Sequence, residues 1–161
     1  MSLQDDFTRQ IKNNYRIIRK VCLIYGQTRD DREDLFQECL FNAWKAYPNF
    51  RKEAKFSTWL YKVALNTALY NKRKNKHAVM EVDLDLNRNA QEERTDHDQL
   101  AQLQHAIAKL NDIEKSIIML FLDGLSYKEI GEIMGLTVSN VGVKLTRVKG
   151  KLKKIMTGDG F

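Results

Sequence analysis

Three polar side chains, Asp34, Gln37 and Glu38, recur in the sequence at spacings i, i+3 and i+4. That spacing places them within one turn on one face of a helix. The segment around them is otherwise basic, because residues 1–80 carry 16 Lys or Arg against 8 acids. We therefore expect this face to bind a basic partner. The alternative is a soluble helix whose early acids complement the helix dipole.

A second candidate binding element is the segment 127–145, whose pattern fits a helix-turn-helix. Ser126, with Glu129 three residues later, forms a capping box that opens the first helix. Gly135 suits the left-handed conformation of a turn, and Thr137 can cap the second helix. We expect this unit to bind DNA. An ordinary antiparallel helix pair is the alternative.

The second helix of this unit carries the side chains that would meet DNA. Residues near its start would reach base edges, whereas later lysines would reach phosphates. Arg147 is the most credible long hydrogen-bond donor, although it could also be a solvated charge. The outward-facing residues are Ser139, Asn140, Val143, Lys144, Thr146, Arg147, Lys151 and Lys154. We also expect Gly131 to let the second helix cross closely, and Leu136 to fill the turn.

The sequence shows none of the residue patterns that are typical of catalytic or metal sites. There is no glycine-rich phosphate loop and no nucleophile beside a base at a known spacing. The histidines (His77, His97 and His105) do not pair with a cysteine at metal-ligand spacing. We therefore expect no enzyme activity, no metal and no cofactor. Cys22 and Cys39 lie far apart in the sequence, and we expect them to be reduced.

Charge is distributed in blocks along the chain. Residues 81–98 carry 2 basic and 7 acidic side chains, and residues 99–161 carry 9 and 6. Two basic blocks therefore flank an acidic connector, and basic surfaces suit polyanions such as nucleic acid. No apolar run approaches the roughly 20 residues of a membrane span, and the start lacks a secretory signal pattern. We expect a cytoplasmic protein with no membrane insertion.

The elements that position these residues are predicted to be helices throughout. An apolar stripe at steps of three and four predicts a first helix, with Phe7, Ile11, Tyr15, Ile18, Cys22 and Tyr25 inward. A second helix is predicted from about Asp30 to Tyr47, with Leu35, Phe36, Cys39, Leu40, Ala43, Trp44 and Tyr47 inward. A third is predicted to begin near Ser57, with Trp59, Leu60, Val63, Ala64 and Ala68 on its buried side.

The fold class is therefore all-α, with two small helical domains at 1–76 and 99–161 joined by a flexible acidic linker at 77–98. In the second domain the expected inward residues of the first helix are Leu100, Leu103, Ile107 and Leu110. Those of the next helix are Ile113, Ile117, Leu120 and Phe121. Those of the last two helices are Ile130, Met134, Val138, Val141, Leu145, Val148 and Leu152.

Both halves together resemble bacterial RNA polymerase sigma factors of the extracytoplasmic-function type. Asp34–Glu38 (DLFQE) resembles the polymerase-binding motif of that family. Phe56–Leu60 (FSTWL), followed by Val63–Ala68 (VALNTA), is similar to the segment that opens and reads the −10 promoter element. Asp123–Ile130 (DGLSYKEI) resembles the entry to the helix-turn-helix that reads the −35 element. The resemblance covers nearly the whole chain.

The resemblance implies partners as well as a fold. Asp34, Gln37 and Glu38 would bind the clamp-helix coiled coil of the polymerase β′ subunit, and the C-terminal domain would lie near the β flap. The other implied partners are promoter DNA and an anti-sigma factor. The chain would then direct promoter-specific initiation without catalysing a reaction.

The resemblance also assigns DNA contacts to the loop between the second and third helices, where this class captures a flipped base. Unstacked bases bind π-faces, cations and amides. Phe50 offers the π-face, Asn49 the amide, and Arg51, Lys52 and Lys55 the charge. Without the resemblance this loop would be an ordinary connector.

Two residues of the third helix complete the predicted −10 set. They are Trp59 and Asn66, which lie two helical turns apart. Trp59 is more often a core residue than a contact, whereas Asn66 could hydrogen-bond to DNA from an exposed flank.

One position departs from the family pattern. Many members carry arginine where this sequence has Gly142, and serine where it has Val143. A glycine there gives up a long donor and costs about 1 kcal/mol of helix stability relative to alanine. We expect the −35 element to differ from the commonest one, or to be read more through backbone approach and phosphate contacts.

Two other binding functions compete with this prediction. A stand-alone helix-turn-helix regulator ends in a similar unit, but the DLFQE patch and the promoter-opening segment argue against it. A sigma mimic would bind an anti-sigma factor and not DNA. The basic residues at 72–76 and 147–154 argue against a mimic, because a decoy does not need them.

Overall fold

Residues 2–75 and 98–158 are the part of the chain that the structure, a computed structural model, describes. The regular structure in these residues is helical, which confirms the predicted all-α class. The chain divides into two compact units, Met1–Val79 and Met80–Phe161. The predicted linker at 77–98 lies outside the described residues except for its last position, and the domain limits stay predictions. No helix within the described ranges has both the length and the apolar content to cross a bilayer.

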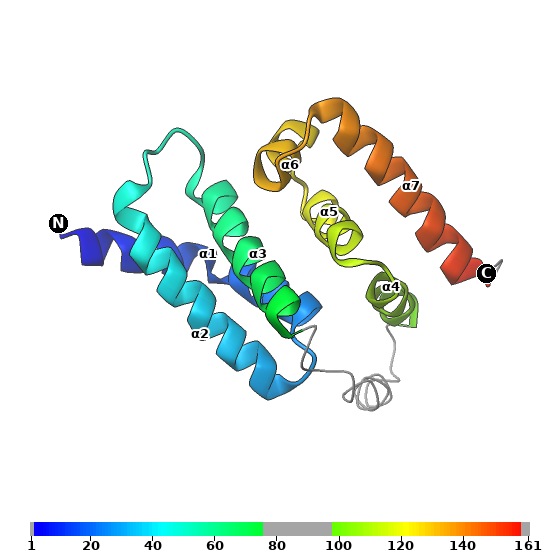
Figure 1. The fold of residues 1–161 in the computed structure, drawn as a ribbon, viewed down its shortest axis with the longest axis horizontal. Helices are drawn as coiled ribbons and strands as arrows, with labels where there is room; N and C mark the ends of the chain where they lie inside the picture. Colours follow the sequence, from blue (N-terminus) through cyan, green and yellow to red (C-terminus); the bar gives the residue numbers. More distant parts are fainter. Residues whose placement is uncertain (1, 76–97, 159–161) are drawn as a thin grey trace. The chain divides into compact units, whose positions relative to one another are not determined.

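The first unit is built from three α-helices that all pack against one another (Figure 1). They are α1 (Leu3–Tyr25), α2 (Arg29–Ala46) and α3 (Phe56–Asn75), and a short 3₁₀ helix, η1 (Tyr47–Asn49), follows α2 directly. Thr28 starts α2 with a capping box, because its hydroxyl accepts from the Asp31 amide and the Asp31 carboxylate accepts from the Thr28 amide. The largest fully buried side chains include Ile18, Tyr61, Leu60 and Leu65.

Two aromatic residues predicted to face inward are on the rim of this core instead. Tyr15 and Trp44 are each 39% exposed. The buried side of α1 runs through Ile17 and Val21, which leaves Tyr15 on the flank, where the Arg19 guanidinium lies 5.5 Å from its ring centroid. The Trp44 ring packs against Phe7, with ring centroids 5.1 Å apart. Amphipathic aromatic rings suit such boundaries.

Both cysteines of the first unit are free thiols, and both are buried. They come from α1 and α2 and meet in the core, where Cys39 Sγ also lies 3.8 Å from the Ala64 carbonyl oxygen. The hydrogen bond with Cys22, together with burial, raises the pKa of Cys39 far above its usual range. Cys39 therefore stays protonated at neutral pH.

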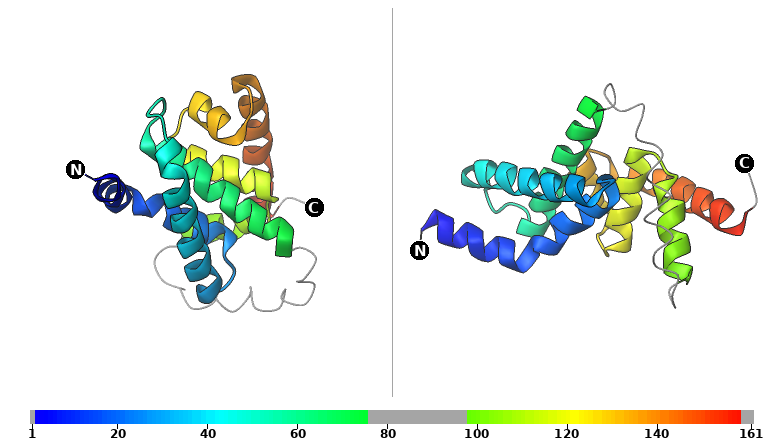
Figure 2. Two further views of the ribbon diagram at one scale, coloured as in Figure 1. Left: turned by 60° about the vertical axis from the view of Figure 1, so that its left-hand side comes forward. Right: turned by 90° about the horizontal axis from the view of Figure 1, so that it is seen from below.

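The second unit is built from α4 (Asp98–Ala108), α5 (Asp112–Leu122), α6 (Tyr127–Met134) and α7 (Val138–Thr157). The long helix α7 packs against each of the other three, as the views in Figures 1 and 2 show. Its core comprises Ala106, Leu110, Ile117, Ile118, Leu145, Val148 and Leu152. The predicted capping box of Ser126 and Glu129 is confirmed, and so is the cap of Thr137 on the Asn140 amide.

Three apolar residues predicted to face this core are exposed instead. They are Leu100, Ile113 and Val138, with exposed fractions of 53%, 43% and 52%. Each lies in the first turn of its helix. Helical periodicity continues into that turn, although its apolar side chains remain exposed.

Two glycines define the turn between α6 and α7. Gly135 ends α6 in the left-handed conformation, with φ of 72°, as predicted. At Gly131 a Cβ atom would lie 2.5 Å from the Leu136 carbonyl oxygen but 3.8 Å from Val141 Cγ2. The close approach that Gly131 permits is therefore made mainly by the turn backbone, and not by the second helix as predicted.

We expect Gly131→Ala to destabilise the second unit by about 1–3 kcal/mol, the usual effect of overpacking, because its new methyl group meets backbone that cannot move aside. Gly150→Ala is the matched control, since a Cβ there meets nothing within 4 Å. It should stabilise α7 by roughly 0.5–1 kcal/mol. Chemical unfolding of the full chain followed by far-UV circular dichroism measures both. Equal effects of the two changes would contradict the assignment of Gly131 to the turn.

Candidate functional site

The polar residues predicted to bind a partner lie together on the exposed side of α2. Asp34, Gln37 and Glu38 are all exposed, whereas Leu35 between them is buried. The Glu38 carboxylate accepts a hydrogen bond from Asn71 Nδ2 of α3. Glu38 therefore has a structural partner, which Asp34 and Gln37 are not shown to have.

An exposed aromatic residue extends this surface and was not predicted. Phe41 lies one turn beyond Glu38 and is 59% exposed, and the Lys45 ammonium lies 5.3 Å from its ring centroid. We call the surface formed by Asp34, Gln37, Glu38 and Phe41 the α2 face. A large exposed ring among polar groups is typical of an interface anchor. The i+7 spacing from Asp34 to Phe41 was the available sequence signal.

The predicted base-capturing loop is exposed at its charged positions. Asn49 ends η1, and Arg51, Lys52 and Lys55 are exposed in the segment that leads to α3. Lys52 has a φ of 58°, the left-handed conformation that non-glycine residues rarely adopt. The loop therefore has a defined and unusual backbone at its centre.

Phe50 occupies a different environment from its neighbours in the loop. Its ring is half-buried and packs against Trp59 at 5.1 Å, Phe56 at 5.8 Å and Tyr47 at 6.0 Å between centroids. Phe7 of α1 also packs on Tyr47, at 5.1 Å. The structure thus brings two predicted DNA contacts, Phe50 and Trp59, into one aromatic cluster at the base of the loop.

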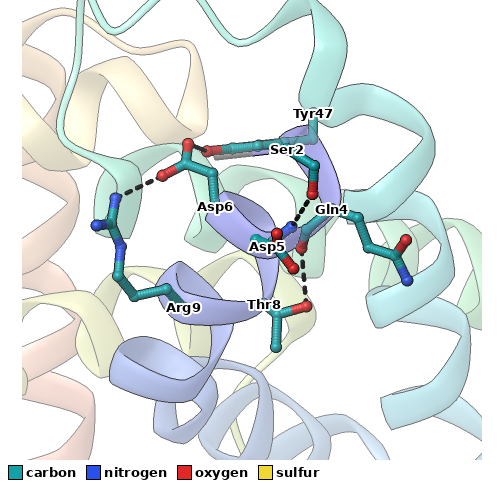
Figure 3. Close-up of polar contacts among 7 residues, drawn as sticks. All are labelled: Ser2, Gln4, Asp5, Asp6, Thr8, Arg9 and Tyr47. Carbon is teal, nitrogen blue, oxygen red and sulfur yellow. Dashed lines mark hydrogen bonds and ion pairs between the residues drawn. The ribbon is translucent and has the colours of Figure 1, made fainter.

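A hydrogen bond links this cluster to the first turn of α1. The Tyr47 hydroxyl donates to Asp6 Oδ2, and Arg9 pairs with the other carboxylate oxygen of Asp6 (Figure 3). Burial, followed by the bond to Asp6, raises the pKa of Tyr47 to about 12. The same bond and the charges of Arg9 and Lys52 hold the pKa of Asp6 below its usual range. Asp6 is therefore ionised and Tyr47 is neutral at physiological pH.

One exposed side of α3 continues from the aromatic cluster. The predicted residue Asn66 is exposed there, and residues at helical spacing around it share that side. Tyr70 is 63% exposed. The exposed residues of this α3 face are Lys62, Asn66, Tyr70 and Arg73. Cations, an amide and an aromatic ring on one helix face suit unstacked nucleic-acid bases. The prediction named Asn66 as a contact and Arg73 only as part of the basic run 72–76, and it missed Lys62 and Tyr70.

The predicted DNA-reading residues of α7 are largely exposed. Those that are exposed are Ser139, Asn140, Val143, Thr146, Arg147, Lys151 and Lys154, whereas Lys144 is half-buried. The Thr146 hydroxyl donates to the Gly142 carbonyl at 2.9 Å, so its donor is used within the helix. A Cβ at Gly142 would lie 3.6 Å from Tyr127 Cε2, an ordinary contact. Packing therefore does not require a glycine there, and the ring of Tyr127 borders the reading surface.

One predicted phosphate contact has a partner inside its own unit. Lys151 Nζ lies 2.6 Å from Glu114 Oε2 of α5. Partial burial raises the pKa of Glu114, but bonds from Lys151 and the Asn111 amide outweigh it and hold the pKa below its usual range. Lys151 thus forms an intramolecular ion pair, and no such pair is found for Lys154 in the described part of the chain.

No group of three or more histidine, cysteine or acidic side chains gathers at metal-binding distance among residues 2–75 and 98–158. Three exposed surfaces are the candidates for binding a partner. They comprise an acidic and aromatic face on α2, a basic and aromatic face on α3 with its loop, and an exposed side of α7.

Family comparisons match both units. Residues 10–78 match the family model for Sigma-70 region 2, and residues 100–152 match that for Sigma-70, region 4. RNA polymerase sigma factor YlaC of Bacillus subtilis is 31% identical over 78% of this chain and 77% of that protein. The ECF RNA polymerase sigma factor SigW of the same species is 30% identical over 77% of this chain and 74% of that protein. The ECF RNA polymerase sigma-E factor of Haemophilus influenzae is 26% identical over 80% and 78%.

Two solved structures share the fold. The sigma factor RpoE from Bartonella quintana, in complex with the anti-sigma factor NepR, gives a TM-score of 0.75 at 21% identity, covering 96% of this chain and 99% of that one. CnrH in complex with the cytosolic domain of CnrY gives 0.70 at 21% identity, covering 98% of this chain and 91% of that one.

Proposed function

The chain belongs to the extracytoplasmic-function group of the sigma-70 family and directs promoter-specific initiation by RNA polymerase, and we propose how its surfaces divide that work. Factors of this family are not enzymes. The observation that carries the proposal is that the first unit exposes an acidic and aromatic α2 face and, separately, a basic and aromatic α3 face. Surfaces of opposite chemistry on one small domain suit two different partners.

We propose that the α2 face binds core polymerase, at the clamp-helix coiled coil of the β′ subunit. Its acids complement a basic partner, and Phe41 can bury a large apolar surface at the centre of the contact. We expect Gln37 to contact the polymerase only, since it is exposed and no intramolecular bond is described for it. Glu38, in contrast, also accepts a hydrogen bond from Asn71. The second unit is proposed to lie near the β flap.

We propose that the α3 face and the loop bind the opened −10 strand. Tyr70 offers a stacking surface and Asn66 a hydrogen-bonding amide, and Lys62 and Arg73 supply charge for the phosphates. The loop residues Asn49, Arg51, Lys52 and Lys55 would hold a flipped base. Phe50 and Trp59 support the loop from below, since their rings pack in the aromatic cluster.

We propose that α7 reads the −35 element, with Arg147 as the long donor. Ser139, Asn140 and Val143 lie nearer the start of the helix, where base edges are met. Lys154 is the better candidate for a phosphate contact than Lys151, which is paired with Glu114.

The remaining expectations are also proposals. Domains at 1–76 and 99–161 are proposed to work as separate binding units, in the cytoplasm and without a cofactor. Because RpoE and CnrH were each solved with a partner, NepR and CnrY, we propose that this chain also binds an anti-sigma factor. A stand-alone regulator does not account for the region 2 match. A sigma mimic would fail to support transcription by core polymerase from any promoter, which tests that alternative.

We expect Gln37→Ala and Phe41→Ala each to weaken binding to core polymerase by about tenfold, as loss of an interface anchor does. The thermal stability of the free protein should not change, because both side chains are exposed. Asn71→Ala is the control for Glu38, since it breaks the same hydrogen bond without altering the α2 face. If Asn71→Ala and Glu38→Ala weaken binding equally, Glu38 acts by holding α3 and not by contacting the polymerase.

We expect Asn66→Ala and Tyr70→Ala each to reduce transcription from duplex promoters about tenfold, the scale of one lost hydrogen bond for Asn66 and of one lost base stack for Tyr70. The loss should be smaller on templates that are already unpaired over the −10 element. Tyr15→Ala removes another exposed aromatic ring, from α1, and should leave both templates unaffected. Equal loss on duplex and opened templates would exclude a role in opening.

We expect Arg147→Ala to change the preference of the holoenzyme among −35 variants, because a bidentate arginine–guanine contact gives about 1–3 kcal/mol of discrimination. Lys154→Ala should weaken binding evenly and lower the slope of log affinity against log salt by roughly 0.9. Lys151→Ala should lower the slope less, because Glu114 already pairs with that lysine. Binding across several salt concentrations measures all three. If Arg147→Ala behaves like Lys154→Ala, the arginine contacts only the backbone.

A further inference from the structure

Tyr47 is the residue around which the base of the loop is organised. Its ring is 4% exposed and contacts Phe50, Phe56 and Trp59, each with centroids 6.0 Å from its own. Phe50 opens the loop and Phe56 closes it. A displacement of Tyr47 would therefore shift both ends of the loop together, because close-packed rings transmit movement.

Packing alone does not orient Tyr47, because its hydroxyl needs a buried hydrogen-bond partner. The partner is Asp6, 41 residues earlier in the chain and in the first turn of α1. A bond to an ionised carboxylate is stronger than one between neutral groups. This bond fixes the hydroxyl end of the ring, while the aromatic contacts fix its faces.

Lys52, at the centre of the loop, carries the charge opposite to that of Asp6. Its positive charge contributes to the lowered pKa of Asp6. Lys52 is the one described non-glycine residue with positive φ. The hydrogen bond from the Tyr47 hydroxyl therefore remains the direct link between Asp6 and the base of the loop.

The turn that carries Asp6 is held in place by its own bonds, drawn in Figure 3. The Ser2 hydroxyl accepts from the Asp5 amide at 3.1 Å and caps α1. The Thr8 hydroxyl donates to the Gln4 carbonyl at 2.8 Å, and Arg9 pairs with Asp6. Asp6 is thus presented to Tyr47 by an ordered helix start.

We propose that Asp6 is a positioning residue for promoter opening, which acts through Tyr47 to set the conformation of the loop at 50–55. This inference rests on the proposed function of that loop in capturing a base of the −10 strand. It adds the first turn of α1 to the parts of the factor that determine how fast a promoter opens, although that turn need not touch DNA.

The test compares Asp6→Ala, Tyr47→Phe and the double variant in holoenzyme on one duplex promoter. The rate of opening is followed by fluorescence of 2-aminopurine placed in the −10 element, and core binding is measured separately. We expect each single variant to slow opening about tenfold, the effect of losing one hydrogen bond to a charged group. The double variant should be no slower than Asp6→Ala, and core affinity should not change. Asp5→Ala is the matched control, because it removes a neighbouring acid of the same helix turn that does not contact Tyr47.

Two results would overturn the inference. One is opening at the wild-type rate by Asp6→Ala. The other is a loss of opening and core binding in the same proportion, which would mean that Asp6 only stabilises the fold. Arg51→Ala changes the loop itself, and it distinguishes failure of the positioning role of Asp6 from failure of the proposed function of the loop. If Arg51→Ala slows opening and Asp6→Ala does not, only the positioning role is wrong. If Arg51→Ala opens at the wild-type rate, the loop does not capture a base.

Discussion

Aromatic packing around Tyr47 connects α1, the end of α2, the loop and α3 of the first unit. Phe7, Phe50, Phe56 and Trp59 all contact that one ring, with centroids 5.1–6.0 Å away. The α3 face begins at Lys62, three residues after Trp59 of this cluster. Because the loop at 50–55 has no regular structure of its own, its shape depends on the rings at its base. The DNA-binding surface proposed for this unit therefore depends on a packed hydrophobic cluster as much as on its exposed charges.

Intramolecular bonds decide which polar side chains remain available to partners. Glu38 holds Asn71, and Lys151 pairs with Glu114, so each would have to exchange an existing bond for an intermolecular one. The Lys151 side chain is exposed, so a polyanion could compete with Glu114 for it. No such intramolecular bond is found for Gln37, Arg147 or Lys154 among the described residues. Charge count alone does not distinguish these groups.

Local chemistry was sufficient to predict the helices and their ends. Capping residues and turn glycines act within three or four residues, so Ser126, Thr137 and Gly135 could be assigned from the sequence alone. Exposure of Asp34 and Gln37 followed from helical spacing for the same reason. Periodicity failed at helix starts and flanks, where Val138 and Tyr15 are exposed, because it describes one helix and not the extent of its neighbours.

The sequence by itself determined the all-helical class, the order of the motifs and their likeness to the sigma-70 family, since these depend on residue types and short spacings. Only the tertiary structure placed Asp6 beside Tyr47, 41 residues away, and Phe50 against Trp59 instead of in solvent. It likewise showed that Phe41 and Tyr70 are exposed and that Lys151 is paired. Such contacts join different helices, and their geometry is set by how whole helices pack, which no local pattern in the chain encodes.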